Sequence, residues 1–390
     1  MEMKTLTIKC LSPVHIGSGR VMKSFEYLYN PDKSEVIFVE RSAWISFLVR
    51  HGIMDEFANY IQVTAKALSS RGNFYGIMPW EWLRQKGIAA EDIEAVASHK
   101  SFATLNTICR EDKDSLNDII ACVTLSNGMP YIPGSSIKGA LRTSILYSLL
   151  MKPENSKFRA RIWNEIEASG DIAGKDVGKA FRRLETDLLS KLEKYRNDML
   201  NSSLRGLKIS DTMCVSGSYD TVVLQKRSAN VKGNGPNEGE HGLPIFLECI
   251  PGGTSFEIQV TADYTMLSKI GLDSINAVFD CSREFVSYNR QVWAEIFFKD
   301  YPSQLAEMEA ADLWLGAGTG FLSKTLVYAI APETKKFVAR KLIASYLDRV
   351  FKKPGHNHRE EDKLLSPRAI KLTQEGQYSQ VMGLCKVFER

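Results

Sequence analysis

Three short segments of the chain combine glycines with hydroxyl and cationic side chains, a composition suited to binding phosphate. The first, at 131–142, reads YIPGSSIKGALR and joins a Pro-Gly turn to a helical pattern. Ser135 or Ser136 can cap this helix by accepting its free backbone N–H groups. Lys138 and Arg142 lie four residues apart and therefore project from one side of the first turns. Exposed N–H groups, the positive end of the helix dipole and two cations predict a phosphate site; an ordinary capped helix with solvated basic residues is the alternative.

A second glycine-rich segment, PVHIGSGR at 13–20, follows a predicted strand at 5–11. Glycine lets the backbone approach a ligand closely, and the histidine, serine and arginine can donate hydrogen bonds. The residues concerned are His15, Gly17, Ser18, Gly19 and Arg20. A strand-end turn with a buried, satisfied histidine explains the same pattern. The segment therefore predicts either a ligand contact or a structural turn.

The third segment, LWLGAGTGFLSKTL at 313–326, carries Gly316, Gly318 and Gly320. Phe321 stands where a dinucleotide fingerprint needs its third glycine, and Ser323 stands where a P-loop needs the glycine before Lys324. Nucleotide hydrolysis is therefore disfavoured. Tight glycines before a helix that carries Lys324 in its first turns still offer backbone N–H groups and one cation, which suit a phosphodiester.

Strand and helix patterns alternate around these segments. Strand patterns occur at 5–11, 25–29, 36–39, 119–125, 207–215, 219–226, 243–250 and 255–262, and helical patterns at 42–110 and 272–298. We expect 25–29 to form a hairpin with 36–39, and 243–250 to form another with 255–262. The stretch 227–241 contains three glycines and a proline, which predicts a mobile projection between two strands.

The composition limits the function classes. With 390 residues, 44% of them hydrophobic, the chain can bury a large core, and its net charge of +4 excludes a histone-like polycation. Seven cysteines without CxxC spacing indicate a reducing compartment. The start lacks a signal peptide and no apolar run reaches the ~18 residues of a membrane span, so we expect a soluble, cytoplasmic protein without a membrane partner.

The C-terminal tail is basic, with eleven Lys or Arg against four Asp or Glu over 335–371. A helix at about 334–353 could follow a polyanion, although a solvated helix explains the same charge. His356 and His358 only superficially resemble a metal pair, because no cysteine or carboxylate framework accompanies them. We therefore expect neither a metal nor another cofactor.

In this order, PVHIGSG, YIPGSSIKGALR and LGAGTGFLSKT resemble the RAMP superfamily of CRISPR effector proteins. The length, the helical insertions and the late GTGFLSKT loop are most similar to the Csm-type subunit of type III-A complexes that sits at the 3′ end of the guide RNA. The resemblance implies an α+β fold of ferredoxin-like (RRM-type) modules. It places one module at 1–262, with helical insertions at about 41–115 and 150–205. A second, degenerate module would cover 263–390 with the late glycine loop and the basic tail.

The resemblance also implies a function: a non-catalytic guide-RNA (crRNA) binding subunit that contacts the 3′ part of the guide and supports its maturation and complex assembly. Its partners would be crRNA, neighbouring Csm-complex subunits and host ribonucleases. No aromatic pair for base stacking is evident on the predicted strands, which favours salt-sensitive binding through phosphates and shape. The implied RNA contacts are His15, Gly17, Ser18, Gly19, Arg20, Ser135, Ser136, Lys138, Gly139, Arg142, Arg227, Gly316, Gly318, Gly320, Phe321 and Lys324.

The alternative function is a metal-independent endoribonuclease that processes precursor crRNA. His15, beside a glycine loop and near Arg20, is its candidate general acid or base. A second proton-transfer group is not evident next to it in the sequence.

Overall fold

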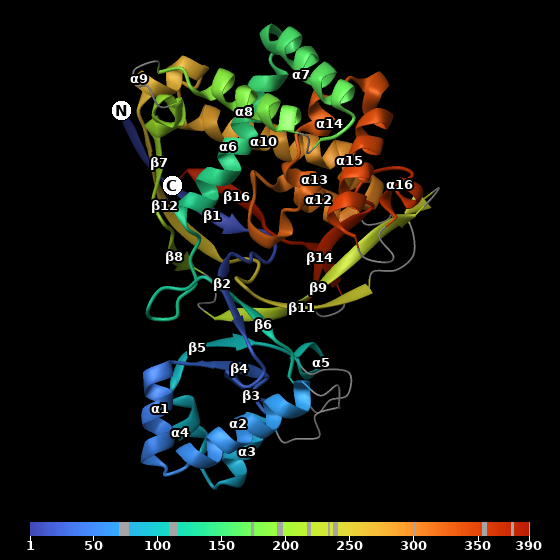
Figure 1. Ribbon diagram of the computed structural model, residues 1–390. Helices are drawn as coiled ribbons and strands as arrows, with labels where there is room; N and C mark the ends of the chain where they lie inside the picture. The colour runs from blue at the N-terminus through green and yellow to red at the C-terminus, as the bar shows by residue number, and fades with distance from the viewer. Residues whose placement is uncertain are drawn as a thin grey trace.

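The computed structural model describes residues 1–69, 78–108, 116–172, 175–192, 198–216, 220–232, 235–236, 241–298, 302–352, 357–375 and 378–389. Two β-sheets form its centre, and helices lie at both ends of the molecule (Figure 1). Helices α1–α4 lie beyond β3, β4 and β5 at one end, while α6, α7, α8, α10 and α15 gather at the other. Among the described residues, no helix has both the length and the apolar character that crossing a bilayer requires.

The smaller sheet carries the ferredoxin-like module. Its six strands follow the order β13-β16-β1-β12-β7, with β8 also pairing β12. Along the chain, β1, α6, β7, β12, α10 and β16 give the β-α-β-β-α-β order, and the strands lie in the spatial order fourth, first, third, second. Their bounds are β1 Glu2–Cys10, α6 Gly134–Met151, β7 Leu207–Ile209, β8 Met213–Ser216, β12 Ser255–Ala262, α10 Ile275–Asn289, β13 Leu313–Trp314 and β16 Leu384–Glu389. The expected α+β, ferredoxin-like fold is confirmed.

Residue periodicity explains how this module closes. On β1 the side chains of Leu6, Ile8 and Cys10 are buried, while Met3 and Lys9 between and beside them are exposed. This alternation gives the sheet one apolar face. Helices α6 and α10 pack against each other, and their apolar stripes belong to the same core as β1. Strand β16, the last strand of this module, lies within residues 263–390. The second module expected over those residues stays a prediction.

The larger sheet has ten strands. Seven of them follow the order β2-β6-β11-β9-β5-β4-β3; β10 and β14 pair with β9, and β15 pairs with β14. Most pairs are antiparallel, but β6 with β11 and β5 with β9 are parallel. The bounds are β2 Gly17–Met22, β3 Tyr27–Asn30, β4 Glu35–Val39, β5 Ala97–Phe102, β6 Ile119–Cys122, β9 Thr221–Lys232, β10 Gly235–Pro236, β11 His241–Cys249, β14 Ala369–Glu375 and β15 Tyr378–Val381.

The remaining helices cover the ends of the two sheets. Those of the first insertion are α1 Arg41–Arg50, α2 Met54–Ser69, α3 Pro79–Gln85, α4 Ala90–Glu94 and α5 Leu105–Ile108. The others are α7 Ser156–Ser169, α8 Lys175–Leu189, α9 Tyr264–Leu267, α11 Glu295–Phe297, α12 Pro302–Ala310, α13 Phe321–Lys324, α14 Val327–Ile330, α15 Lys336–Val350 and α16 His358–Glu361. A π-helical turn, Arg290–Ala294, continues α10.

Three predictions of local structure are wrong. The helical region at 42–110 is interrupted by β5, which pairs with β4 and β9. The hairpin of 243–250 with 255–262 does not form, because β11 belongs to the larger sheet and β12 to the smaller one. Residues 227–232 of the expected loop continue β9, held by pairing with β11 and β14; residues 233–234 and 237–240 lie outside the described part of the chain.

Carboxylates pair with several cations of the basic tail. Arg349 pairs with Asp171 and Lys335 with Glu167, which fixes α15 against α7 and the residues that follow it. At α16, Arg359 pairs with Asp348 at 2.9 Å. Because these cations are already paired, the tail is a weak candidate for binding a polyanion along its length.

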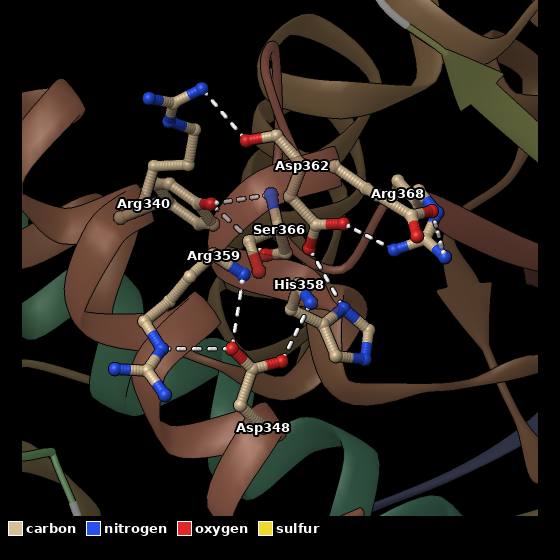
Figure 2. Close-up of polar contacts among 9 residues, drawn as sticks. Arg340, Asp348, His358, Arg359, Asp362, Ser366 and Arg368 are labelled. Atoms are coloured by element: carbon tan, nitrogen blue, oxygen red, sulfur yellow. Dashed lines mark hydrogen bonds and ion pairs between the residues drawn. The ribbon is translucent and has the colours of Figure 1, made fainter. Parts of the chain in front are cut away.

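A buried carboxylate holds the end of the tail. The Asp362 side chain is inaccessible to solvent and accepts from Arg368 at 2.9 Å and from His358 Nδ1, also at 2.9 Å (Figure 2). The Asp362 carbonyl oxygen accepts from Arg340 of α15 at 2.7 Å. His358 therefore takes part in a structural network, and His356 lies outside the described residues.

Candidate nucleic-acid interface

The three glycine-containing segments meet at one cleft of about 600 Å³. The first contributes Ser136, Gly139 and Thr143 from α6, and the second contributes His15 and Gly17. The third contributes the turn that begins at Gly316, together with Thr319, Ser323 and Lys324. Helix α10 closes the cleft with Ser282, Phe285, Val286 and Asn289. Segments separated by hundreds of residues thus form a single site.

The cleft-facing side of α6 consists of small and hydroxyl residues. Ser136, Gly139, Ala140, Thr143 and Ser144 recur at helical spacing and line the cleft. The opposite stripe of Ile137, Leu141, Ile145 and Leu149 is buried in the core. The helix therefore presents hydroxyl groups and a bare backbone to the cleft.

Neither serine caps α6, so the capping prediction is wrong. The helix starts at Gly134, whose N–H donates to Asp211 Oδ1 at 2.8 Å. A Cβ at Gly134 would lie 2.3 Å from the carbonyl oxygen of Ile209, so only glycine fits here without a shift. Because Asp211 already supplies an anion at the helix start, the ligand-facing part of α6 begins at Ser136.

His15 is buried against the larger sheet at the edge of the cleft. Its Nδ1 lies 2.6 Å from the carbonyl oxygen of Glu248. A carbonyl oxygen only accepts, so Nδ1 carries the proton and Nε2 is left as an acceptor. Burial lowers the pKa of His15, which keeps the ring neutral near pH 7.

Glu248 anchors His15 through a second layer of contacts. Its buried carboxylate accepts from His99 Nε2 at 2.7 Å, from Thr221 Oγ1 at 2.7 Å and from the Cys122 N–H at 2.8 Å. Burial alone would raise the pKa of Glu248, but these hydrogen bonds bring the pKa below its ordinary value. The charged carboxylate therefore joins β5, β6, β9 and β11 beneath the cleft.

The late glycines serve backbone packing as well as the cleft. A Cβ at Gly316 would lie 2.2 Å from the carbonyl oxygen of His15, and one at Gly318 would lie 1.9 Å from that of Met382. The Ala317 N–H donates to the His15 carbonyl oxygen at 2.9 Å. These close approaches explain the glycines at 316 and 318, whereas a Cβ at Gly320 would meet open space.

Arg20 pairs with Glu26 at 3.9 Å, and two further predicted cations, Lys138 and Arg142, are also engaged within the chain. Lys138 Nζ donates to the Leu207 carbonyl oxygen at 2.6 Å, and burial lowers its pKa, with Lys208 adding to the effect. Arg142 pairs with Glu185 at 2.7 Å on the exposed surface of α6 and α8. Neither lines the cleft. Lys324 does line it, is exposed, and forms no ion pair with any residue that the structure describes.

The other predicted contacts lie around the cleft. Ser18, Gly19 and Arg20 form an exposed bulge of β2, and Ser18 Oγ donates to the Ala121 carbonyl oxygen at 3.1 Å. Ser135 is exposed in the first turn of α6, and Phe321 lines a neighbouring cleft that shares Thr143 and Lys324 with the first. Arg227 is half-buried within β9. The three segments are thus brought together only in part.

The charge and polarity of the cleft suit a phosphate-bearing ligand. None of the described residues that line it is acidic, and Lys324 provides a cation. Phe285, Val286, Trp314 and Leu315 add apolar surface. Sequence reasoning missed Thr143, Thr319, Ser282 and Asn289; only the small-residue spacing of α6 could have indicated the first of these.

The fold is that of a RAMP-type protein. The model of the RAMP superfamily matches residues 7–323, and the chain belongs to this superfamily. It is similar to the CRISPR system Cms protein Csm5 of Mycobacterium tuberculosis, with 25% identity covering 98% of this chain and 96% of the relative. Csm5 of Enterococcus italicus is 25% identical, with coverage of 88% and 85%.

Solved structures share the fold. One chain of the cryo-EM structure of a Csm–crRNA–target RNA ternary complex of a type III-A CRISPR-Cas system superposes with a TM-score of 0.64, at 19% identity and full coverage of both chains. The crystal structure of T. onnurineus Csm5 gives a TM-score of 0.55 at 20% identity, covering 83% of this chain and 92% of that one. The expected resemblance to Csm-type RAMP proteins is confirmed.

Proposed function

We propose that this chain is a non-catalytic, crRNA-binding subunit of a type III-A CRISPR interference complex. In that complex it contacts the 3′ part of the guide and supports guide maturation and assembly. The observation that carries the proposal is the convergence of the three glycine-containing segments on one cleft whose described lining residues include no acidic side chain. Similarity to Csm5 proteins along most of the chain supports it.

Each part of the cleft has a role in binding a polynucleotide backbone. Lys324 compensates the charge of a phosphate, and the hydroxyls of Ser136, Thr143 and Thr319 donate hydrogen bonds to phosphate or ribose oxygens. The bare backbone at Gly139 lets the strand approach α6 closely. The apolar surface of Phe285 and Trp314 accommodates a sugar or a base face.

Arg142 and Lys138 differ in how easily they could join the RNA contact. The Arg142–Glu185 pair is about half exposed on both sides, and such pairs contribute only about 0–1 kcal/mol. Arg142 can therefore turn toward a phosphate at small cost. Lys138 would have to leave a buried carbonyl partner, so its RNA contact is the weaker of the two predictions.

The partners follow from this assignment. A subunit at the 3′ part of the guide would contact the neighbouring RAMP backbone subunit of the Csm complex. Host ribonucleases that trim the guide would act beside it. The insertion helices α1–α4 and α7–α8, which lie at opposite ends of the molecule (Figure 1), would provide surface for these contacts.

The geometry of the cleft also offers support for the endoribonuclease alternative. His15 is neutral, its Nε2 is an acceptor, and Lys324 lines the same cleft as a second proton-transfer group. Incubation of the chain with precursor RNA in EDTA separates the two functions. A product with a 2′,3′-cyclic phosphate end that is lost in His15→Ala would support the enzyme; the binding subunit gives none.

Salt-dependent RNA affinity tests the binding function. We expect Lys324→Ala to weaken crRNA binding and to reduce the slope of log K against log salt by about 0.7, the value for one phosphate contact on a single strand. Lys341→Ala, an exposed lysine of α15 away from the cleft, is the matched control. An unchanged slope for Lys324→Ala would contradict the assignment.

A further inference from the structure

Two half-buried lysines, Lys226 on β9 and Lys371 on β14, project from one face of the larger sheet. In the antiparallel β9–β14 pair, Lys371 lies opposite Ser228 and Lys226 lies opposite Thr373. Residues directly opposite each other share a face, so the two lysines are diagonal neighbours, about 7–8 Å apart at the backbone. This register places two ammonium groups together at the middle of β9.

The polar partners of both lysines are neutral. Lys371 Nζ donates to Ser228 Oγ at 3.1 Å, and Lys226 Nζ donates to the Ala317 carbonyl oxygen at 3.5 Å. Within the described ranges, neither lysine forms an ion pair with a carboxylate. Burial lowers the pKa of both ammonium groups, and the charge of Lys226 lowers that of Lys371 further. A partly desolvated ammonium group is stabilised by an anion, and the described residues provide neither lysine with one.

The lysine pair lies beside the cleft. Ala317, which accepts from Lys226, belongs to the glycine turn that lines the cleft. The charge of Lys226 also reaches His15, whose pKa it helps to lower after the larger effect of burial. A polynucleotide that passes over the Gly316–Gly318 turn therefore meets Lys226 first and Lys371 next.

The basic tail shows the opposite arrangement. There Arg349, Arg359 and Arg368 each face a carboxylate. Lys226 and Lys371, the latter at the end of the same basic stretch, differ from these three arginines in having neutral polar partners. A phosphate of a bound ligand would supply the anion that the described residues do not.

We propose that Lys226 and Lys371 together bind one phosphate of the guide RNA, directly beyond the contacts made in the cleft. The proposal rests on the proposed crRNA-binding function and extends its RNA path from the smaller sheet onto β9 and β14. When both ammonium groups bind one phosphate, two charge-assisted hydrogen bonds offset their mutual repulsion. The pair thus acts as a phosphate clamp formed by two strands.

The test is a double variant, Lys226→Met with Lys371→Met, which keeps the apolar stems and removes the charges. We expect guide-RNA affinity to fall about tenfold, as for a lost hydrogen bond to a charged group, and the salt slope to fall by about 0.7. The control is Lys157→Met with Lys341→Met, two exposed lysines on α7 and α15. Arginine at both test positions keeps the charge and should retain the slope.

Thermal unfolding without RNA supplies a second readout. Removing two half-buried like charges should raise the melting temperature of the double Met variant above that of the wild type. Guide RNA should raise the melting temperature of this variant by less than it raises that of the wild type. A purely structural role of the lysines predicts a lower melting temperature instead, which would overturn the proposal.

Comparison with Lys324→Ala distinguishes the possible failures. If the double variant binds RNA normally while Lys324→Ala binds weakly, the lysine clamp is wrong and the cleft assignment stands. If neither variant binds weakly, both assignments are wrong. If the double variant keeps its RNA affinity but loses assembly with neighbouring subunits, the lysines hold an acidic protein segment and the RNA proposal is overturned.

Discussion

Gly139 offers a test in which stability and RNA binding move in opposite directions. It lies in the interior of α6, is exposed and lines the cleft, and a Cβ built on it meets no atom within 4 Å. Glycine in a helix interior costs about 1 kcal/mol relative to alanine. Nothing in the packing requires the glycine, so we attribute it to the ligand.

The magnitude follows from helix propensity. Gly139→Ala should raise the free energy of unfolding by about 1 kcal/mol. An unfolding entropy of about 2.1 cal/mol/K per residue gives about 0.8 kcal/mol/K for 390 residues, so the melting temperature should rise by about 1 °C. Gly139→Leu should gain similar stability but place four carbon atoms in the cleft. We expect it to weaken guide-RNA binding at least tenfold, or about 1.4 kcal/mol.

The assays are urea unfolding and fluorescence anisotropy with labelled guide RNA. Gly178→Leu is the matched control, because Gly178 lies exposed in α8 and a Cβ there also meets open space. The control should gain stability and bind RNA normally. A Gly139→Leu variant that binds as tightly as the wild type would refute the RNA path along α6, and a destabilised Gly139→Ala would refute the open space beside it.

Three further predictions follow from the groups beneath and beside the cleft. Glu248→Gln places an amide N–H₂ group where a carboxylate oxygen accepted from His99, Thr221 or the Cys122 N–H. The free energy of unfolding in urea should fall by about 3–5 kcal/mol. A fall under 1 kcal/mol would contradict the buried charge. Because burial lowers the pKa of His15, the unfolded chain takes up a proton below pH 6.5 that the folded chain refuses, so stability should fall as the pH drops below 6.5. In His15→Asn this loss should shrink by up to about 1.4 kcal/mol per pH unit, and an unchanged pH profile would argue against a neutral, buried ring. Glu185→Ala frees Arg142 and should strengthen guide-RNA binding without a measurable loss of stability, as the exposed pair contributes at most about 1 kcal/mol; weaker binding would exclude Arg142 from the RNA contact.

The sequence predicted those helices and strands whose regular pattern of buried residues lies within the segment itself. The strand predicted at 5–11 and the helix predicted to begin within 131–142 depend on patterns inside their own segments, and β1 and α6 confirm both predictions. Strand β5, with the sequence ASHKSF, has little strand character and forms because β4 and β9 pair with it. The Asp211 cap of α6 comes from 77 residues away, beyond the reach of any local capping rule.

The site was predicted in its parts but not in its assembly. The glycine segments carried a recognisable phosphate chemistry, yet nothing in the sequence showed that His15, Ser136 and Lys324 share one cleft. The sequence predicts ligand contacts for the glycines at 316 and 318, whereas their tight neighbours are residues 15–16 and 382 of the chain itself. Lys226 and Lys371 are far apart in sequence and become neighbours only through the β9–β14 register.

Crosslinking of guide RNA to the chain in the assembled complex, mapped to residues, tests the central claim most directly. The account predicts crosslinks in 15–20, 135–143 and 316–324, with a further group at 226–228 and 371. Crosslinks confined to the outer helices α1–α4 and α7–α8, with none in those segments, would contradict it.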